Sequence, residues 1–232
     1  IRDTAANVST TDLTALNQAV NIISSDSTTY AQAKVIHDAT NSGYNLYDIS
    51  DTAANMSTGT ATDVNVISGA RTVACTTYTT VTEANAIANI NKAVIYSIKD
   101  TSLNLASLGG TNPNALNEAV NIISTDSCSF AQAKTIEDAT NSGYETYDIT
   151  DTATNLTAGI GSDEAVITNA QTVAASTYAT AAEANVLAGS TKAIIYSIKD
   201  TATAIAGANA GARNEAVNII CTTAATVAEA TT

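Results

Sequence analysis

Apolar and polar residues alternate in a short segment that recurs along the chain. In its first complete copy, Tyr47, Ile49 and Asp51 fall on one face of a predicted β-strand, and the polar residues between them fall on the other. The pattern Tyr-x-Ile-x-Asp-Thr occupies residues 47–52, 96–101, 147–152 and 196–201, and Ile1-Arg2-Asp3-Thr4 matches its second half. The predicted strand therefore recurs about every 50 residues.

Helical patterns follow each strand. In the first repeat, Leu13, Leu16, Val20 and Ile23 keep a spacing of three to four residues, which predicts one helix with an apolar face. A second helix is predicted by a capping box, in which Ser or Thr is followed three residues later by Glu or Gln. Five such boxes lie in register: Thr29/Gln32, Thr80/Glu83, Ser129/Gln132, Thr180/Glu183 and Thr226/Glu229.

Odd and even repeats alternate. Residues 15–23 return at 115–123 with one substitution, so the stronger period is 100 residues. In the odd repeats, Gly43 and Gly143 are predicted to end the second helix in the left-handed conformation. In the even repeats, residues 64–70 fit a helix, whereas residues 65–74 fit strand, turn and strand, and the sequence leaves both open.

These patterns predict an α/β fold built as a solenoid-like array of strand–helix–helix repeats, in which each repeat covers the apolar face of its neighbour. The expected repeats of this single array are 1–46, 47–95, 96–146, 147–195 and 196–232. Strands lie about 4.8 Å apart and packed helices about 8–10 Å apart. One strand per repeat would force the array to curve and two would allow a straight rod, and the sequence does not choose between them.

Composition limits the partners. Hydrophobic residues make up 45% of the chain and charged residues only 13%, and the net charge is −13. An excess of carboxylates argues against nucleic acid and anionic membrane surfaces as partners, because both require clustered Lys and Arg. No apolar run approaches the roughly 20 residues of a membrane span. A surface of small polar residues with few charges suits packing against copies of itself.

The recurring aspartates are the first candidate site: Asp3, Asp51, Asp100, Asp151 and Asp200. Carboxylates at stacked strand ends are candidates for a cation such as Ca²⁺, although no EF-hand loop is present. The sequence favours a second interpretation, in which each Asp-Thr pair caps the following helix. Loss of this cap in Asp100→Ala is expected to cost about 1 kcal/mol.

Asparagines also recur, as Asn7, Asn55, Asn104 and Asn155. Asn7, Asn55 and Asn155 begin Asn-x-Ser/Thr sequons and are candidate glycosylation sites in a secreted protein. Asn104 is an asparagine at the same position but does not begin a sequon. This favours a structural role, in which a buried asparagine makes hydrogen bonds to the backbone of a loop. The sequons then follow from the structural role of the asparagine.

Other candidate residues are better explained by structure. The tyrosines of the strand pattern could stack sugars, but their position beside Ile favours a core role: Tyr47, Tyr96, Tyr147 and Tyr196. His37 is the single histidine, its repeat equivalent is Glu137, and an exposed helix position is predicted for it. With one histidine, no repeated Ser-His-Asp or Cys-His nucleophile system can be assembled.

The cysteines Cys75, Cys128 and Cys221 occupy positions where other repeats have Ser, Thr or Ala, so they are predicted to fill small-residue positions without binding metal. Cys75 and Cys221 share one position in repeats that are not adjacent. At about 8–10 Å per packed layer, they are expected to lie beyond the roughly 7 Å between Cα atoms that a disulfide can bridge. A link between Cys75 and Cys128 is left open.

The combination of Tyr-x-Ile-x followed by Asp-Thr-Ala-Ala-Asn, with Ala-Leu-Asn-Glu-Ala-Val and Thr-x-x-Glu-Ala between copies, resembles tandem repeats of very large secreted or surface proteins of bacteria, including cyanobacteria and proteobacteria. The resemblance covers the whole chain. It implies an extracellular adhesive or structural role, with no catalytic residues to transfer.

The sequence therefore predicts an extracellular structural protein that forms a filament or a segment of a longer surface protein. A catalytic site needs unlike groups that converge once, whereas here the notable polar residues recur. The alternative is a surface adhesion module that binds glycans or calcium, and an α/β enzyme is a distant third. We also expect copies, or further repeats of the same chain, to lie end to end around Ile1, Leu13 and Leu16, because the terminal repeats lack polar caps.

Overall fold

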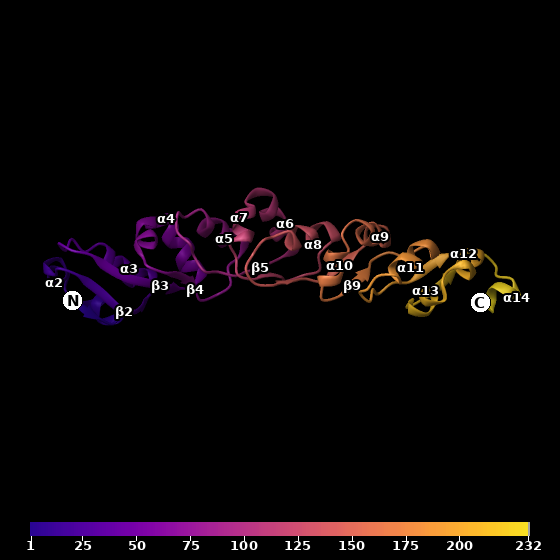
Figure 1. The fold of residues 1–232 in the computed structure, drawn as a ribbon, viewed down its shortest axis with the longest axis horizontal. Helices are drawn as coiled ribbons and strands as arrows, with labels where there is room; N and C mark the ends of the chain where they lie inside the picture. Colours follow the sequence, from indigo (N-terminus) through magenta and orange to yellow (C-terminus); the bar gives the residue numbers. More distant parts are fainter. Residues whose placement is uncertain (232) are drawn as a thin grey trace. The chain divides into compact units, whose positions relative to one another are not determined.

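The computed structural model describes residues 1–231 and has an α/β fold with parallel strands, which confirms the predicted class (Figure 1). The chain forms two compact units. Compact unit 1 comprises residues 1–100, 107–123 and 139–144. Compact unit 2 comprises residues 101–106 and 124–138 together with the chain from Glu145 onward.

The strands of compact unit 1 pair in parallel and in chain order. One sheet contains β1 (Arg2–Asp3), β2 (Ile22–Thr28), β3 (Asn45–Asp51) and β4 (Val73–Cys75). Paired residues lie 21 to 24 positions apart in the sequence, as in Arg2↔Ile23 and Ile49↔Val73. Bridges from Ala74 to Ile95 and from Thr79 to Ile98, the first residue of β5 (Ile98–Asp100), continue the same pairing. Each parallel strand thus requires a crossover segment, which the helices provide.

Helices of compact unit 1 pack on one another in chain order. They are α1 (Ala5–Thr10), α2 (Leu13–Gln18), α3 (Tyr30–His37), α4 (Ala53–Gly69), α5 (Val81–Ala88) and α7 (Pro113–Asn117). Helix α1 packs against α3, α3 against α4, and α4 against α5. Their inner faces bury Leu16, Ile36, Met56, Ile67 and Ile87. Helix α6 (Ser102–Thr111) and strand β6 (Ile122–Ser124) have residues in both compact units.

Compact unit 2 has the same kinds of element. Its strands are β7 (Glu145–Thr146), β8 (Ile149–Asp151), β9 (Val173–Ala175), β10 (Ile198–Asp200) and β11 (Ile219–Cys221). Its helices are α8 (Phe130–Glu137), α9 (Ala153–Ser162), α10 (Glu164–Asn169), α11 (Ala181–Leu187), α12 (Ala202–Gly207), α13 (Ala210–Glu215) and α14 (Val227–Ala230). Strand β8 pairs in parallel with β9, and β10 with β11.

All five predicted capping boxes are confirmed, at the starts of α3, α5, α8, α11 and α14. At α5, for example, Glu83 N–H donates to Thr80 Oγ1 at 3.3 Å, and Thr80 N–H donates to Glu83 Oε2 at 2.8 Å. Each box satisfies two backbone donors that a helix start would otherwise leave free.

The prediction of one helix through Leu13, Leu16, Val20 and Ile23 is wrong. Helix α2 ends at Gln18, and β2 begins at Ile22. Leu16 is buried, whereas Leu13 and Val20 are exposed. The β-branched residues after Ala19 enter a second strand, which gains parallel partners on both sides. The first repeat therefore contains β1 and β2 before β3 begins at Asn45, where the sequence predicted one strand.

The predicted role of Gly43 and Gly143 is also wrong. Helices α3 and α8 end at His37 and Glu137, and none of the glycines among the described residues has a positive φ. A Cβ atom at Gly43 would collide with the carbonyl oxygen of Val20 and with Asn21 Oδ1. Glycine is needed here because two backbone segments approach each other closely.

For the first half of the even repeats, the helix alternative is correct for the earlier residues and the strand alternative for the later ones. Residues 64–69 belong to helix α4, and residues 73–75 form strand β4. Helix α4 is kinked at Asp63, where φ is −157° and ψ is 89°. The equivalent Asp163, with φ −157° and ψ 78°, separates α9 from α10.

Gly159→Ala is expected to destabilise compact unit 2 by about 1–3 kcal/mol, because a new methyl group would overpack the core. The Cβ atom would lie 2.6 Å from Cδ2 of the Phe130 ring. Gly161→Ala in the same helix is the matched control, since its Cβ atom meets no atom within 4 Å. It should be neutral or slightly stabilising. Urea denaturation of both variants measures the difference, and equal effects would contradict the close packing.

Candidate functional site

The recurring aspartates connect the starts of two helices. Asp51 Oδ1 accepts hydrogen bonds from Thr52 N–H and Asn55 Nδ2, both at 2.8 Å. Asp51 Oδ2 accepts from the backbone N–H of Tyr30, the first residue of α3, at 2.8 Å. One carboxylate therefore binds the start of α4 and the start of α3, which precedes it by more than 20 residues.

The contact to the earlier helix recurs at three further aspartates. Asp100, Asp151 and Asp200 accept through Oδ2 from the first backbone N–H of α5, α8 and α11, at 2.8, 2.9 and 3.0 Å. The threonine after each aspartate caps the following helix: Thr52 is the N-cap of α4, and Thr152 is the N-cap of α9. The predicted Asp-Thr cap is therefore confirmed in part: the threonine side chain accepts from the helix backbone, and Asp51 and Asp151 accept from the N–H of that threonine. The aspartate also binds the preceding helix, a second role that the sequence did not indicate.

Asp3 differs from the other aspartates. It is exposed, and its Oδ1 accepts from Thr4 N–H at 2.7 Å and from Asn7 Nδ2 at 3.0 Å. These hydrogen bonds hold the pKa of Asp3 below its ordinary value, with Asn7 contributing most. In the same way, the backbone N–H groups of Ala181 and Thr201 lower the pKa of Asp200. A cation at these carboxylates would compete with N–H donors for the same oxygen lone pairs.

The recurring asparagines are exposed, so the expectation of buried residues is wrong. Asn7, Asn55 and Asn155 lie in the first turns of α1, α4 and α9, and each side-chain amide donates to the aspartate four residues earlier. The asparagine thus orients the carboxylate. Glycosylation at these three sequons remains a prediction, and it would modify the same Nδ2 atom that makes this hydrogen bond.

The core role of the recurring tyrosines is confirmed. Tyr47, Tyr96, Tyr147 and Tyr196 are at most 2% exposed. The hydroxyls of Tyr47, Tyr96 and Tyr196 donate to the backbone carbonyls of Val66, Ala115 and Ala212 at 2.8 Å. The Tyr147 hydroxyl donates to Glu137 Oε2 at 2.7 Å, and Val166 O lies 3.1 Å away. The rings are therefore inaccessible to a sugar.

Alkaline pH is expected to unfold the protein through these tyrosines. Burial, assisted by Asp63 and Asp38, raises the pKa of Tyr47 to about 12, and burial also raises the pKa of Tyr96. In the unfolded chain tyrosine ionises near pH 10, so the native state holds its protons more tightly and stability is lost as pH rises from about 10 to 12. Circular dichroism and tyrosinate absorbance should change together. Ionisation without unfolding would contradict the burial.

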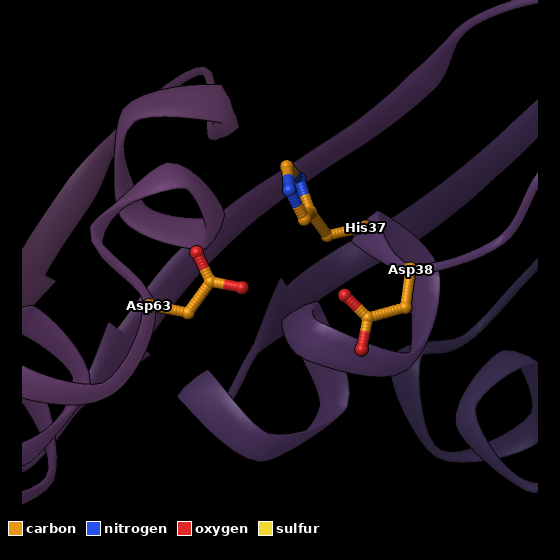
Figure 2. A group of neighbouring side chains, drawn as sticks. All are labelled: His37, Asp38 and Asp63. Carbon is orange, nitrogen blue, oxygen red and sulfur yellow. The ribbon is translucent and has the colours of Figure 1, made fainter.

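A cluster that the sequence did not predict lies at the end of α3. His37, Asp38 and Asp63 have ligand atoms within 4.8 Å of one another, and Figure 2 shows Asp63 facing the end of the helix that carries the other two. His37 is partly buried, with Nδ1 3.1 Å from the hydroxyl oxygen of Tyr47, so its predicted exposed position is wrong. The kink at Asp63 brings the aspartate to this position.

Lys34 forms ion pairs with both carboxylates of the cluster. Its Nζ lies 2.8 Å from Asp38 and 3.5 Å from Asp63. In compact unit 2, Lys134 lies 2.8 Å from both Asp138 and Asp163, and hydrogen bonds from these carboxylates raise the pKa of Lys134. The recurring element is thus an ammonium between two carboxylates, which fixes the kink against the preceding helix.

Zinc is expected to leave the melting temperature of the wild-type protein unchanged, because the Lys34 ammonium occupies the space between the carboxylates. Lys34→Met should expose them and give a zinc-dependent rise in melting temperature. The rise should disappear when His37→Ala is added. Differential scanning fluorimetry with and without zinc measures these effects, and a zinc response of the wild-type protein would contradict the role of Lys34.

The three cysteines are free thiols that differ in their exposure to solvent. Cys128 is buried, Cys75 is partly buried and Cys221 is exposed. Burial, assisted by Glu83 and Asp51, raises the pKa of Cys75 to about 12, and burial also raises the pKa of Cys128. Both thiols are therefore protonated and poor nucleophiles at neutral pH.

Two similar surface grooves lie beside exposed tyrosines. In compact unit 1 the groove is lined by Tyr78, Ile95 and Ser97, and in compact unit 2 by Tyr178, Ile195 and Ser197. Lys99 Nζ lies 5.8 Å from the centre of the Tyr78 ring, and Lys199 Nζ lies 5.6 Å from that of Tyr178. A ring, an aliphatic side chain and a hydroxyl are a combination that can contact a sugar.

Comparison of the chain with protein-family models, with curated proteins and with solved structures gave no match. Among the described residues, every helix is too short or too polar to span a bilayer.

Proposed function

We propose that this protein is an extracellular structural protein of a bacterial surface, built as a solenoid-like array of repeats of about 50 residues. It serves as a filament or as a segment of a longer surface protein and carries out no catalysis. The extracellular location follows the resemblance of its repeated sequence to the tandem repeats of large secreted bacterial proteins.

The observation that supports the array most strongly is the recurring carboxylate contact. Asp51, Asp100, Asp151 and Asp200 each bind the first backbone N–H of a helix that lies 19 or 21 residues earlier. One side chain thereby fixes the position of a strand end against the preceding helix. A residue used in this way in four of the five repeats is a structural connector, whereas a catalytic site needs unlike groups that meet once.

Dimensions also support the array. Strands β1 and β2 belong to the first repeat, and β3, which begins at Asn45, and β4 belong to the second, so these two repeats supply two strands each. Two paired strands extend the sheet by about 9–10 Å along the array, which matches the separation of about 8–10 Å between packed helices. Strands and helices can therefore stack with the same advance per repeat, which removes the mismatch that one strand per repeat would cause.

Deleting residues 51–150 tests the array, because the deletion joins Ser50 to Asp151 and restores the pattern Tyr-x-Ile-x-Asp-Thr in register. An array depends on contacts between neighbours, so the shortened protein should melt cooperatively. The control deletion of residues 51–125 joins unlike parts of two repeats and should abolish the cooperative melt. Loss of folding in both variants would reject the array.

The filament role is tested by light scattering across protein and salt concentrations. We expect self-association that strengthens with salt, because salt screens the repulsion between chains of net charge −13. Electron microscopy of the associated protein should show linear assemblies. A monomer under all conditions would reject the filament and leave only the role of a segment in a longer protein.

The grooves beside Tyr78 and Tyr178 favour a second candidate, a surface adhesion module for glycans. A glycan array with the wild-type protein tests it, with Tyr78→Ala/Tyr178→Ala as the comparison. Binding that the double variant loses would support adhesion. Calcium binding is tested by melting with calcium and with chelator, and an unchanged melting temperature would exclude it as a stabilising ligand.

A further inference from the structure

Residues 95–99 present three side chains to solvent beside an exposed tyrosine. The residues between them are buried, so Ile95, Ser97 and Lys99 share the outward face of one extended segment. Tyr78 lines the same groove and is 49% exposed, and Ile95 is 59% exposed. The groove of compact unit 2 repeats the four residues as Tyr178, Ile195, Ser197 and Lys199.

The fold does not require the ring and the ammonium of this groove. Both grooves lie where an even repeat meets the odd repeat that follows it. The two junctions from an odd repeat to an even one have the same strand pairing, as Thr28↔Ile49 corresponds to Thr79↔Ile98. Small hydroxyl residues replace the tyrosine and the lysine at these junctions: Ser27 and Ser50 at one, Ser127 and Thr150 at the other.

Lys99 has no counter-ion in the part of the chain that the structure describes, and the same holds for Lys199. Carboxylates or carbonyl oxygens bind other cations of the chain: Lys34, Arg71, Lys92, Lys134 and Lys192. The contact of its ammonium with the Tyr78 ring holds Lys99 beside the groove. This ammonium is therefore available to pair with an anionic group of a ligand.

Each groove also offers a hydrogen-bond donor. The backbone N–H and Nδ2 of Asn121 both donate to Ser97 Oγ at 3.3 Å. In compact unit 2, Asn218 Nδ2 donates to Ser197 Oγ at 3.4 Å. Among the described residues, no acceptor is recorded for the proton of either serine hydroxyl, so each hydroxyl can donate to an oxygen of a ligand.

We propose that each groove binds an acidic sugar of a polysaccharide, with the carboxylate of a uronic acid paired with Lys99 or Lys199. The apolar face of the sugar packs against Tyr78 and Ile95, and the serine hydroxyl donates to a sugar oxygen. The inference rests on the second candidate function, adhesion to glycans, and specifies the class of glycan.

Charge and size favour a sparsely charged chain. Each groove has one ammonium, and the net charge of −13 repels densely charged polymers such as nucleic acid. The grooves of compact units 1 and 2 measure about 400 and 350 Å³, at the lower end of the range for small-molecule sites, so each holds a short part of a polymer.

Calorimetric titration of the full chain tests the proposal with two probes. One is a tetrasaccharide in which glucuronic acid alternates with N-acetylglucosamine. The other is its methyl ester, which has the same rings without the charge. The acid should bind at two sites per chain, and the ester should bind about fivefold more weakly, because it lacks the exposed ion pair at each groove.

Two double variants assign the binding to the grooves. Lys99→Met/Lys199→Met should lower the affinity for the acid to that for the ester. Tyr78→Ala/Tyr178→Ala should weaken the binding of both probes. The substituted side chains are exposed, so the melting temperature should stay close to that of the wild-type protein.

The matched control moves the charge to junctions that have no ring. Ser50→Lys and Thr150→Lys, added to the lysine double variant, restore the net charge of −13 and should not restore binding of the acid. Recovery of acid binding in this control would overturn the proposal in favour of non-specific attraction between charges.

Other outcomes separate the acidic class from adhesion itself. Equal affinity for acid and ester, lost in the tyrosine double variant, would reject the acidic class and leave adhesion to glycans intact. Polyglutamate that binds as tightly as the acid would overturn the sugar in favour of an acidic peptide. No binding of either probe would reject the acidic class, and an empty glycan array as well would also reject adhesion.

Discussion

Tyr96→Ala is expected to destabilise compact unit 1 by about 3–5 kcal/mol, the cost of removing a large buried aromatic side chain. The Tyr96 ring is 2% exposed, and its hydroxyl donates to Ala115 O at 2.8 Å. The substitution therefore removes the packing of the ring and also leaves a buried carbonyl without its donor. Urea denaturation followed by circular dichroism measures the free energy of unfolding.

Two control variants separate these contributions. Tyr96→Phe keeps the ring and loses only the hydrogen bond, which should cost about 1–2 kcal/mol. Tyr78→Ala removes an exposed ring and should change stability by no more than about 0.5 kcal/mol. If Tyr96→Ala costs no more than Tyr78→Ala, the core role of the recurring tyrosine is refuted.

Asp51→Ala is expected to destabilise compact unit 1 by about 2–3 kcal/mol, because it removes the acceptor of partly buried backbone donors at two helix starts. Asp51 is buried and accepts from Thr52, Asn55 and Tyr30. The sequence predicts about 1 kcal/mol for the equivalent variant Asp100→Ala, the cost of one cap. The second helix accounts for the larger value.

The control for Asp51→Ala is Asn55→Ala, which removes one donor and leaves both backbone contacts of the carboxylate. It should cost less than half as much. Thermal melts with and without calcium are recorded for each variant. An unchanged melt of Asp51→Ala together with a lost calcium response would assign the aspartates to a metal and refute their structural role.

Local chemistry explains which elements the sequence predicted correctly. The Thr80/Glu83 capping box forms within one helical turn, so its two residues and their spacing are sufficient to identify it. The burial of Tyr47 follows from alternation along one strand, where neighbouring side chains point to opposite faces. Neither inference requires knowledge of a distant partner.

The second strand was missed for the opposite reason. Val20 and Ile23 fit a helical spacing with Leu13 and Leu16, and periodicity over so short a segment does not separate helix from strand. Strand β2 is fixed by parallel pairing with β1 and β3, whose paired residues lie more than 20 positions away. Such pairing depends on contacts that no local pattern contains.

By itself, the sequence determined the α/β class, the starts of the capped helices and the buried tyrosines, since each follows from residues within a few positions of one another. Only the tertiary structure decided that Asp51 binds the start of α3 as well as α4, and that the kink at Asp63 brings this residue to His37. These contacts join residues about 20 or more positions apart. They form because parallel pairing brings successive strands together and thereby places each helix start beside the next strand end.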